Sequence, residues 1–354
     1  MKNNITRRKA LISSTVISGF LMPVSCQSFG EEEVLQDGHQ PFLSPWSPPV
    51  GQERNLTPGT TPLRIAARGP GTDLQYPDEG SITEIVREIK DSGYSSTTAR
   101  YGVGNRNPWL NAPEADIREL KVALQQYDVT FFGFRAANNL IHPDSEERKV
   151  IHRWLIEQCE ASERLGAPTV TTAIGSKSPE SATTIHPDNW TNETWREGIK
   201  VIKEILTATA GMKVVLGIEA LNLTAVNNPR AHAQLIEEVS DPRCKVTLDP
   251  VNMIHTGNYY KSTELIEECF ELLGENIVVA DAKDSYILPR RMSCYLTEVA
   301  PGLGVVDYET YLVGLSRLAY PRPLLIEGIS AEDCPKAKQY LEDTAAKVGV
   351  KIYG

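Results

Sequence analysis

The sequence predicts an α/β fold, and in particular a (β/α)8 TIM barrel, on two observations. Eight short strand-like runs alternate with eight amphipathic helical patterns from about residue 62 to the end of the chain. In addition, no Gly-x-Gly-x-x-Gly motif follows the first strand, which disfavours the rival architecture, a doubly wound open sheet. A barrel of this kind builds its active site from the carboxyl ends of its strands.

The strand candidates are apolar, β-rich and mostly uncharged, as buried parallel strands are. In order they cover residues 63–68, 95–101, 129–135, 169–174, 214–220, 245–251, 277–281 and 323–329. Each is followed by apolar residues at helical spacing, which predicts helices at 82–91, 114–126, 146–165, 193–209, 231–239, 262–273, 308–318 and 331–348. Several glycines directly follow these helices, as helix-terminating residues do.

The N-terminal 28 residues are typical of an export signal. Arg7 and Arg8 precede a moderately apolar stretch that is too short and too rich in Ser, Thr and Gly for a stable membrane span. The pair favours the twin-arginine (Tat) route over an ordinary secretory signal, and the location of a variant with both arginines changed to lysine tests this. Cys26 leaves a lipid anchor open, although Pro23 breaks the usual lipobox. We therefore expect an exported protein of the periplasm or cell envelope.

Residues 29–61 are rich in Pro, Gly and Glu and predict a tether, or an arm lying on the barrel domain of residues 62–354. The 354-residue chain is 41% hydrophobic, enough to bury a full core, and its net charge of −10 argues against a nucleic-acid partner. The cysteines after Cys26 form no Cys-x-x-Cys pair, so a zinc site or disulfide framework is not expected. The oligomeric state is left open.

Four acidic residues close four of the apolar runs in the C-terminal half. Glu219, Asp249, Asp281 and Glu327 end the fifth to eighth strands, which are neighbours around one half of a barrel rim. A carboxylate at such a position is costly unless it is paired or bound to a metal. The sequence therefore predicts a cage for a divalent cation. Arginines end or approach the ends of the first three strands: Arg68, Arg100 and Arg135.

Five motifs in this order resemble those of the sugar phosphate isomerase/epimerase superfamily, the xylose isomerase-like TIM barrels. They are Gly-Ile-Glu-Ala-Leu-Asn at 217–222, Thr-Leu-Asp-Pro-Val-Asn at 247–252, Asp-Ala-Lys-Asp at 281–284, Pro-Gly-Leu-Gly-Val-Val-Asp-Tyr at 301–308 and Ile-Glu at 326–327. The resemblance spans about residues 63–354. It implies Glu219, Asp249, Asp281 and Glu327 as metal ligands, and Glu219 and Glu327 as the proton-transferring pair.

Two departures from the family pattern bear on the chemistry. Asp281 stands where the family usually has a histidine ligand, and Asn252 stands where a substrate-contacting histidine often lies. An all-carboxylate cage is a hard donor set, so we expect Mn²⁺, with Mg²⁺, Co²⁺ or Ca²⁺ as alternatives. Asp249 could instead form an Asx turn with Pro250, and Asp281 could cap a loop.

Five further residues are candidates for binding a carbohydrate substrate. Lys283 could face the substrate or pair with Asp284, and Arg135 could bind substrate or form a salt bridge inside the rim. Trp190 could offer an apolar platform to a sugar ring, or its side chain could merely hold its own loop in place by packing. The other two candidates are Asn252 and His186.

The resemblance implies a metal-dependent isomerase or epimerase that acts on a ketose or keto-sugar through an enediolate. The same first proton abstraction would let a lyase expel the aglycone of a 3-keto-glycoside, and the expected export favours that alternative. A non-catalytic, metal-stabilised sugar-binding barrel is a third interpretation. A barrel endonuclease is disfavoured by Arg100 and Arg135, which stand at strand ends where that class has histidines, and by the acidic net charge.

Overall fold

A computed structural model describes residues 56–353 except 70, 104–106, 137 and 289–293. The predicted export signal, with Arg7, Arg8 and Cys26, lies outside the described residues, as does most of the predicted tether. The fold below is that of the described residues within the unit Pro41–Gly354.

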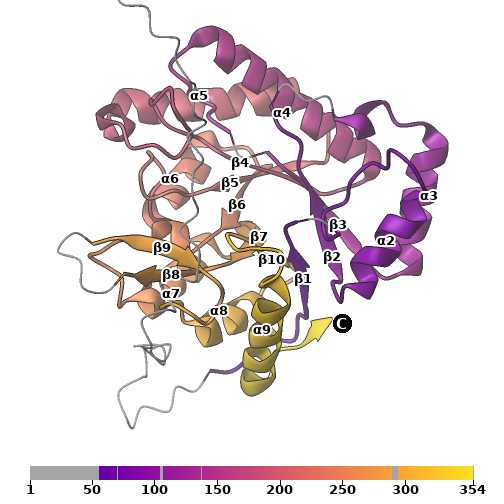
Figure 1. Ribbon diagram of the computed structural model, residues 1–354. Coiled ribbons are helices and arrows are strands. Elements are labelled where there is room, and N and C mark those ends of the chain that lie inside the picture. Colours follow the sequence, from indigo (N-terminus) through magenta and orange to yellow (C-terminus); the bar gives the residue numbers. More distant parts are fainter. Residues whose placement is uncertain (1–55, 70, 104–106, 137, 289–293, 354) are drawn as a thin grey trace, which may run out of the picture. The chain divides into compact units, whose positions relative to one another are not determined.

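Parallel strands form a nine-stranded sheet in the order β11-β1-β10-β7-β6-β5-β4-β3-β2 (Figure 1). The backbone N–H of Ser95, directly before β2, donates to the carbonyl of Ile65 in the middle of β1 (3.3 Å), and this contact between the two sides of the sheet closes it into a barrel. The strands are β1 Leu63–Ala67, β2 Ser96–Ala99, β3 Thr130–Arg135, β4 Thr169–Ala173, β5 Val215–Glu219, β6 Cys244–Leu248, β7 Ile277–Ala282, β10 Pro323–Ile326 and, at the edge, β11 Ile352–Tyr353. The predicted barrel is confirmed.

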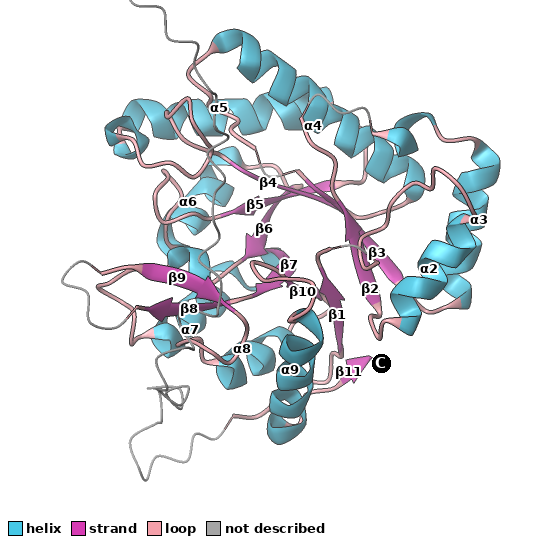
Figure 2. Ribbon diagram, in the orientation of Figure 1, coloured by secondary structure: helices cyan, strands magenta, loops and turns pink. Residues whose placement is uncertain are grey.

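Helices follow the strands and pack outside the sheet (Figure 2). Apolar faces at helical spacing drive this packing, as Ile82, Val86 and Ile89 do in the first described helix. The helices are α2 Ile82–Asp91, α3 Glu114–Gln126, α4 Ser145–Leu165, α5 Asn192–Ala208, α6 Pro229–Val239, α7 Ser262–Leu273, α8 Tyr308–Ser316 and α9 Cys334–Val348. Among the described residues, no helix has the length and apolarity that a membrane crossing requires.

Most predicted strands run one to three residues beyond the observed ends. The sixth strand stops at Leu248 because Asp249 and Pro250 begin a turn that leads into a 3-10 helix, Val251–Met253. The eighth stops at Ile326, and Gly328 then adopts the left-handed conformation (φ +77°), which ends an extended strand.

The strand register brings the strand-end side chains to one level. Leu248 pairs with Ala280 and Ala67 pairs with Ile326, so Asp249 lies beside Asp281 and Arg68 beside Glu327, one residue further along. Likewise Ala99 pairs with Phe134, which sets Arg100 beside Arg135. Because parallel strands all end at the same rim, residues up to 259 positions apart become neighbours there.

An antiparallel hairpin between β7 and α8 was not predicted. It consists of β8 (Asp284–Ile287) and β9 (Leu296–Val299). The buried Asp284 carboxylate accepts hydrogen bonds from the backbone N–H groups of Gly302 (3.0 Å) and Val306 (2.9 Å). These hydrogen bonds hold the Pro-Gly-Leu-Gly loop against the hairpin.

The described end of the predicted tether is an arm on the barrel. The backbone N–H of Thr61 donates to the Ser316 carbonyl (3.1 Å), and the Arg317 guanidinium donates to the Thr57 carbonyl (2.9 Å). Residues 56–61 therefore lie on the end of α8.

His232 on α6 supplies a pH-dependence prediction. Its side chain is fully buried, neither ring nitrogen has a hydrogen-bond partner among the described residues, and burial lowers its pKa to about 4, offset only in part by the nearby Ile218 backbone. An unfolded chain takes up this proton below pH 6.5 whereas the folded chain does not, so stability is lost as the pH falls from 6.5 towards 4. Between pH 7 and pH 5 the loss is about 2 kcal/mol.

Urea unfolding at the two pH values tests this against His232→Leu, which cannot titrate. Between pH 7 and pH 5, the free energy of unfolding of the variant should rise by about 2 kcal/mol relative to that of the native chain. Parallel pH profiles of the two proteins would contradict the assignment.

Candidate metal centre

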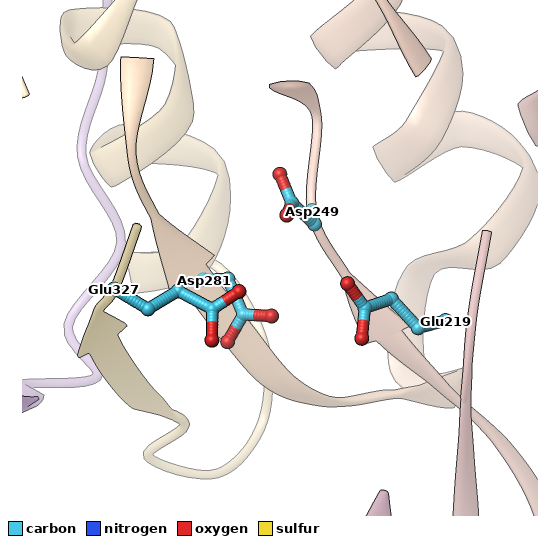
Figure 3. Close-up of side chains that lie close together, drawn as sticks. All are labelled: Glu219, Asp249, Asp281 and Glu327. Carbon is cyan, nitrogen blue, oxygen red and sulfur yellow. The ribbon is translucent and has the colours of Figure 1, made fainter. Parts of the chain in front are cut away.

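Four buried carboxylates converge at the rim of the barrel (Figure 3). Glu219 is the last residue of β5, Asp249 follows β6, Asp281 lies near the end of β7 and Glu327 follows β10. Each offers an oxygen atom, and these atoms all lie within 4.8 Å of one another. The convergence predicted for these residues is therefore present, and it is a result of strand register rather than of proximity in sequence.

Arg135, the last residue of β3, inserts its guanidinium among these carboxylates. Its Nη1 donates to both oxygens of Asp281 (2.9 and 3.1 Å), and its Nη2 donates to Glu327 Oε2 (2.9 Å) and lies 3.6 Å from Glu219 Oε2. The side chain is 5% exposed. Arg135 is thus a salt-bridge partner inside the rim, and a contact with substrate remains a prediction.

Lys283 approaches the cluster from the side of the hairpin. Its ammonium lies 2.9 Å from Asp249 Oδ2, 3.6 Å from Glu327 Oε1 and 3.0 Å from Glu298 Oε1 on β9. The alternative pairing with Asp284 is not observed, because Asp284 is occupied by the loop backbone. Glu298 could not be anticipated, since nothing in the sequence indicated the hairpin that carries it.

Asp249 serves the turn and the cluster at once. Its Oδ1 accepts from the N–H groups of Val251 (2.9 Å) and Asn252 (3.3 Å), which is the Asx turn that Pro250 suggested. Its Oδ2 has the ion-pair contact with Lys283 but no properly angled hydrogen bond from the described residues. One carboxylate oxygen is therefore fixed by the backbone and the other is aimed into the cluster.

Asn252 positions Glu219. Its Nδ2 donates to Glu219 Oε1 (2.5 Å), from the 3-10 helix after β6. Burial raises the pKa of Glu219 to about 7, and Arg135 only partly opposes that effect. The hydrogen bond shows that Asn252 holds the carboxyl group of Glu219. The substrate contact expected of Asn252 remains a prediction.

Glu327 has the opposite electrostatic environment. Burial alone would raise its pKa, but Arg135, Lys283 and Arg68 together lower it to about 2. Arg68 contributes a hydrogen bond from Nη1 to Glu327 Oε2 (3.2 Å). Two carboxyl groups of similar chemistry thus differ in proton affinity because three cations surround one of them, the arrangement by which proteins divide acid and base roles.

The residues present fit a divalent cation of the Mg²⁺ or Mn²⁺ class. The donor set consists of carboxylate oxygens only, which hard cations prefer, and the buried Asp249 Oδ2 pairs with the Lys283 ammonium but accepts no properly angled hydrogen bond from the described residues. Glu219, Asp249, Asp281 and Glu327 would hold such an ion. Arg135 and Lys283 bind the same oxygens and offset their mutual repulsion.

Two of the predicted substrate-binding residues, His186 and Trp190, stand at the two ends of a short 3-10 helix. His186 caps a short 3-10 helix, Pro187–Trp190, by accepting from the Asp188 N–H (3.2 Å), and Trp190 at its end is 49% exposed. Within the described part of the chain, no hydrogen bond or ion pair joins either side chain to the four carboxylates. Their substrate roles remain predictions.

The comparisons with known proteins agree with this architecture. The family described as xylose isomerase-like TIM barrel matches residues 86–346, well over half of the chain. The chain belongs to the xylose isomerase-like TIM barrel family. No curated protein is significantly similar to it in sequence.

Solved structures share the fold at low sequence identity. A xylose isomerase-like TIM barrel protein from Mycobacterium smegmatis, in complex with magnesium, is 13% identical with a TM-score of 0.57, covering 81% of this chain and 98% of its own. D-psicose 3-epimerase with D-tagatose, from Clostridium cellulolyticum H10, is 14% identical with a TM-score of 0.55, covering 77% of this chain and 95% of its own. A protein described as a probable 3-DHS dehydratase involved in petrobactin synthesis, from Bacillus anthracis, is 14% identical with a TM-score of 0.58, covering 79% of this chain and 97% of its own.

Proposed function

We propose that this protein is a divalent-metal-dependent enzyme that isomerises or epimerises a ketose or keto-sugar through an enediolate. The observation that carries the proposal is the meeting of four buried carboxylates with Lys283 and Arg135 at the catalytic rim of the barrel. Family membership and the similarity in fold to a ketose 3-epimerase support the same class of reaction.

The chain's own residues supply the parts that proton transfer requires. Glu219 and Glu327 are two carboxyl groups on different strands, and each can take a proton from, or return it to, the carbon beside a carbonyl. Asn252 holds Oε1 of Glu219, whereas Oε2, which lies 3.6 Å from Arg135 Nη2, is the oxygen that would face the substrate. Lys283 and Arg135 place fixed positive charge where the enediolate oxygens would become negative. A bound divalent cation would add the polarisation of a carbonyl and its neighbouring hydroxyl.

A second candidate is a lyase that expels the aglycone of a 3-keto-glycoside. Removal of the proton on the second sugar carbon puts negative charge β to the aglycone on the first carbon, so elimination can follow the same first step. The similarity in fold to a dehydratase, an eliminating enzyme, and the export proposed from the N-terminal sequence favour this candidate. If the barrel has lost turnover, it would be a metal-stabilised sugar-binding module.

Incubation in D₂O separates the three candidates. The purified, metal-loaded protein is incubated with a panel of ketoses and 3-keto-glycosides, and the products are analysed by mass spectrometry and proton NMR. Deuterium in recovered or isomerised sugar without released aglycone supports the isomerase or epimerase. Stoichiometric aglycone with a 2-hydroxy-enone supports the lyase. Binding with neither result would overturn both enzymatic proposals.

A further inference from the structure

Three guanidinium groups occupy the rim at the ends of three consecutive strands. Arg68 follows β1, Arg100 follows β2 and Arg135 ends β3. The register places Arg100 level with Arg135, and the contact of Arg68 and Arg135 with the same Glu327 oxygen brings those two side chains together. The arginines therefore form one positively charged side of the barrel mouth, adjacent to the carboxylate cluster.

The three arginines differ in how far the protein itself satisfies them. Arg135 binds three carboxylates, and Arg68 uses one terminal nitrogen on Glu327. Arg100 is exposed and has neither a hydrogen bond nor an ion pair with any residue in the described part of the chain. A guanidinium carries five N–H donors in a rigid fork, so Arg100 and the outer edge of Arg68 offer donors that the fold does not use.

The local electrostatics favour an incoming anion at this position. The pKa of Arg100 is lowered by partial burial first and then by repulsion from Arg68 and Arg135, and attraction to Glu327 and Asp73 does not compensate. Asp73 is a second counter-charge that acts on Arg100, but its Oδ1 has no hydrogen-bond partner among the described residues, and burial raises its pKa to about 6. Arg100 is thus held near two other guanidinium groups without a direct hydrogen-bond or ion-pair partner of its own among the described residues.

We propose that Arg68 and Arg100 form an anion subsite, and that the substrate is a sugar acid whose carboxylate binds there while its carbonyl end faces the carboxylate cluster. The sugar part of this inference rests on the proposed function. A carboxylate is favoured over a phosphate because its single charge suits a site that includes Asp73, and because its two coplanar oxygens match the guanidinium fork.

The test measures binding rather than turnover. Dissociation constants for D-glucuronate, D-glucose and D-glucose 6-phosphate are determined by calorimetry on the metal-loaded protein, for the native chain and for Arg100→Gln. The matched control is Arg196→Gln, which changes an exposed arginine on α5. Thermal unfolding of each variant verifies that it is folded, and Arg100→Lys, which keeps the charge but loses the fork, gives a second measurement at the same position.

The native chain should bind glucuronate at least about 10-fold more tightly than glucose, as expected for charge-assisted hydrogen bonds. Arg100→Gln should reduce this preference on the order of 10-fold, Arg100→Lys by less, and Arg196→Gln not at all. The preference of the native chain should also weaken at high salt. A preference that is absent in the native chain, or unchanged in Arg100→Gln, overturns the subsite, and tighter binding of the phosphate than of glucuronate overturns the assignment to a carboxylate.

The two proposals fail separately. Deuterium exchange into neutral ketoses, combined with equal affinity for glucose and glucuronate, would retain the proposed function and remove the subsite. An Arg100-dependent preference for glucuronate without exchange or elimination on any sugar would retain the subsite and remove the enzymatic function.

Discussion

Glu219→Gln combined with Asp249→Asn is expected to abolish metal binding while leaving the barrel folded. Hard divalent cations bind carboxylate oxygens, and the double change removes two of the four converging charges without altering side-chain shape. About one ion per chain in the native protein should fall to a small fraction of that value. Metal analysis after dialysis gives the content, and far-ultraviolet circular dichroism shows whether the helices persist.

The fold should tolerate the change because two cations would remain close to the other carboxylates. Arg135 still pairs with Asp281 and Glu327, and Lys283 with Glu298. The control is Glu298→Gln, an equivalent carboxyl-to-amide change at a half-exposed residue that touches Lys283 but is not a member of the cluster. It should retain the ion. Full metal content in the double variant would show that the four carboxylates are not the metal site.

Glu327→Gln is expected to lower turnover by on the order of 10² or more, the scale of a lost general acid or base. The amide keeps the shape of the side chain but can neither accept nor return a proton. It also removes the anion that Arg68, Arg135 and Lys283 share, so these cations would turn to the remaining carboxylates. Rates of deuterium uptake into the sugar that the native protein processes measure the effect.

Because Glu327 is also a candidate metal ligand, the rate must be expressed per metal-loaded chain. Metal content is therefore measured on the same samples, and the assay is repeated with excess Mn²⁺. The control is Glu275→Gln, which removes a carboxylate that pairs with Arg322 at the opposite end of the β10 strand. Near-native turnover at full metal loading would remove Glu327 from proton transfer.

Much of this protein is determined by local sequence pattern. The alternation of apolar strands and amphipathic helices was sufficient to predict the barrel, and α2, α3 and α7 begin and end where helical spacing placed them. The four strand-end acids were identified as one cluster for the same reason: in a parallel barrel, the strand end alone specifies the rim. These features depend on periodicity and chain order, which are explicit in the sequence.

Only the tertiary structure decided how these charges are distributed among partners. The β8–β9 hairpin supplies Glu298 as a partner for Lys283, whereas Asp284 binds the loop backbone instead. Arg135 bridges three carboxylates, while Arg100 has no hydrogen-bond or ion-pair partner in the described chain. Such pairings depend on side-chain reach across strands that are far apart in sequence, and on burial that strengthens each charge interaction. Neither quantity is encoded in a local pattern, so the sequence could indicate which groups gather at the rim but not which of them are left free to bind a ligand.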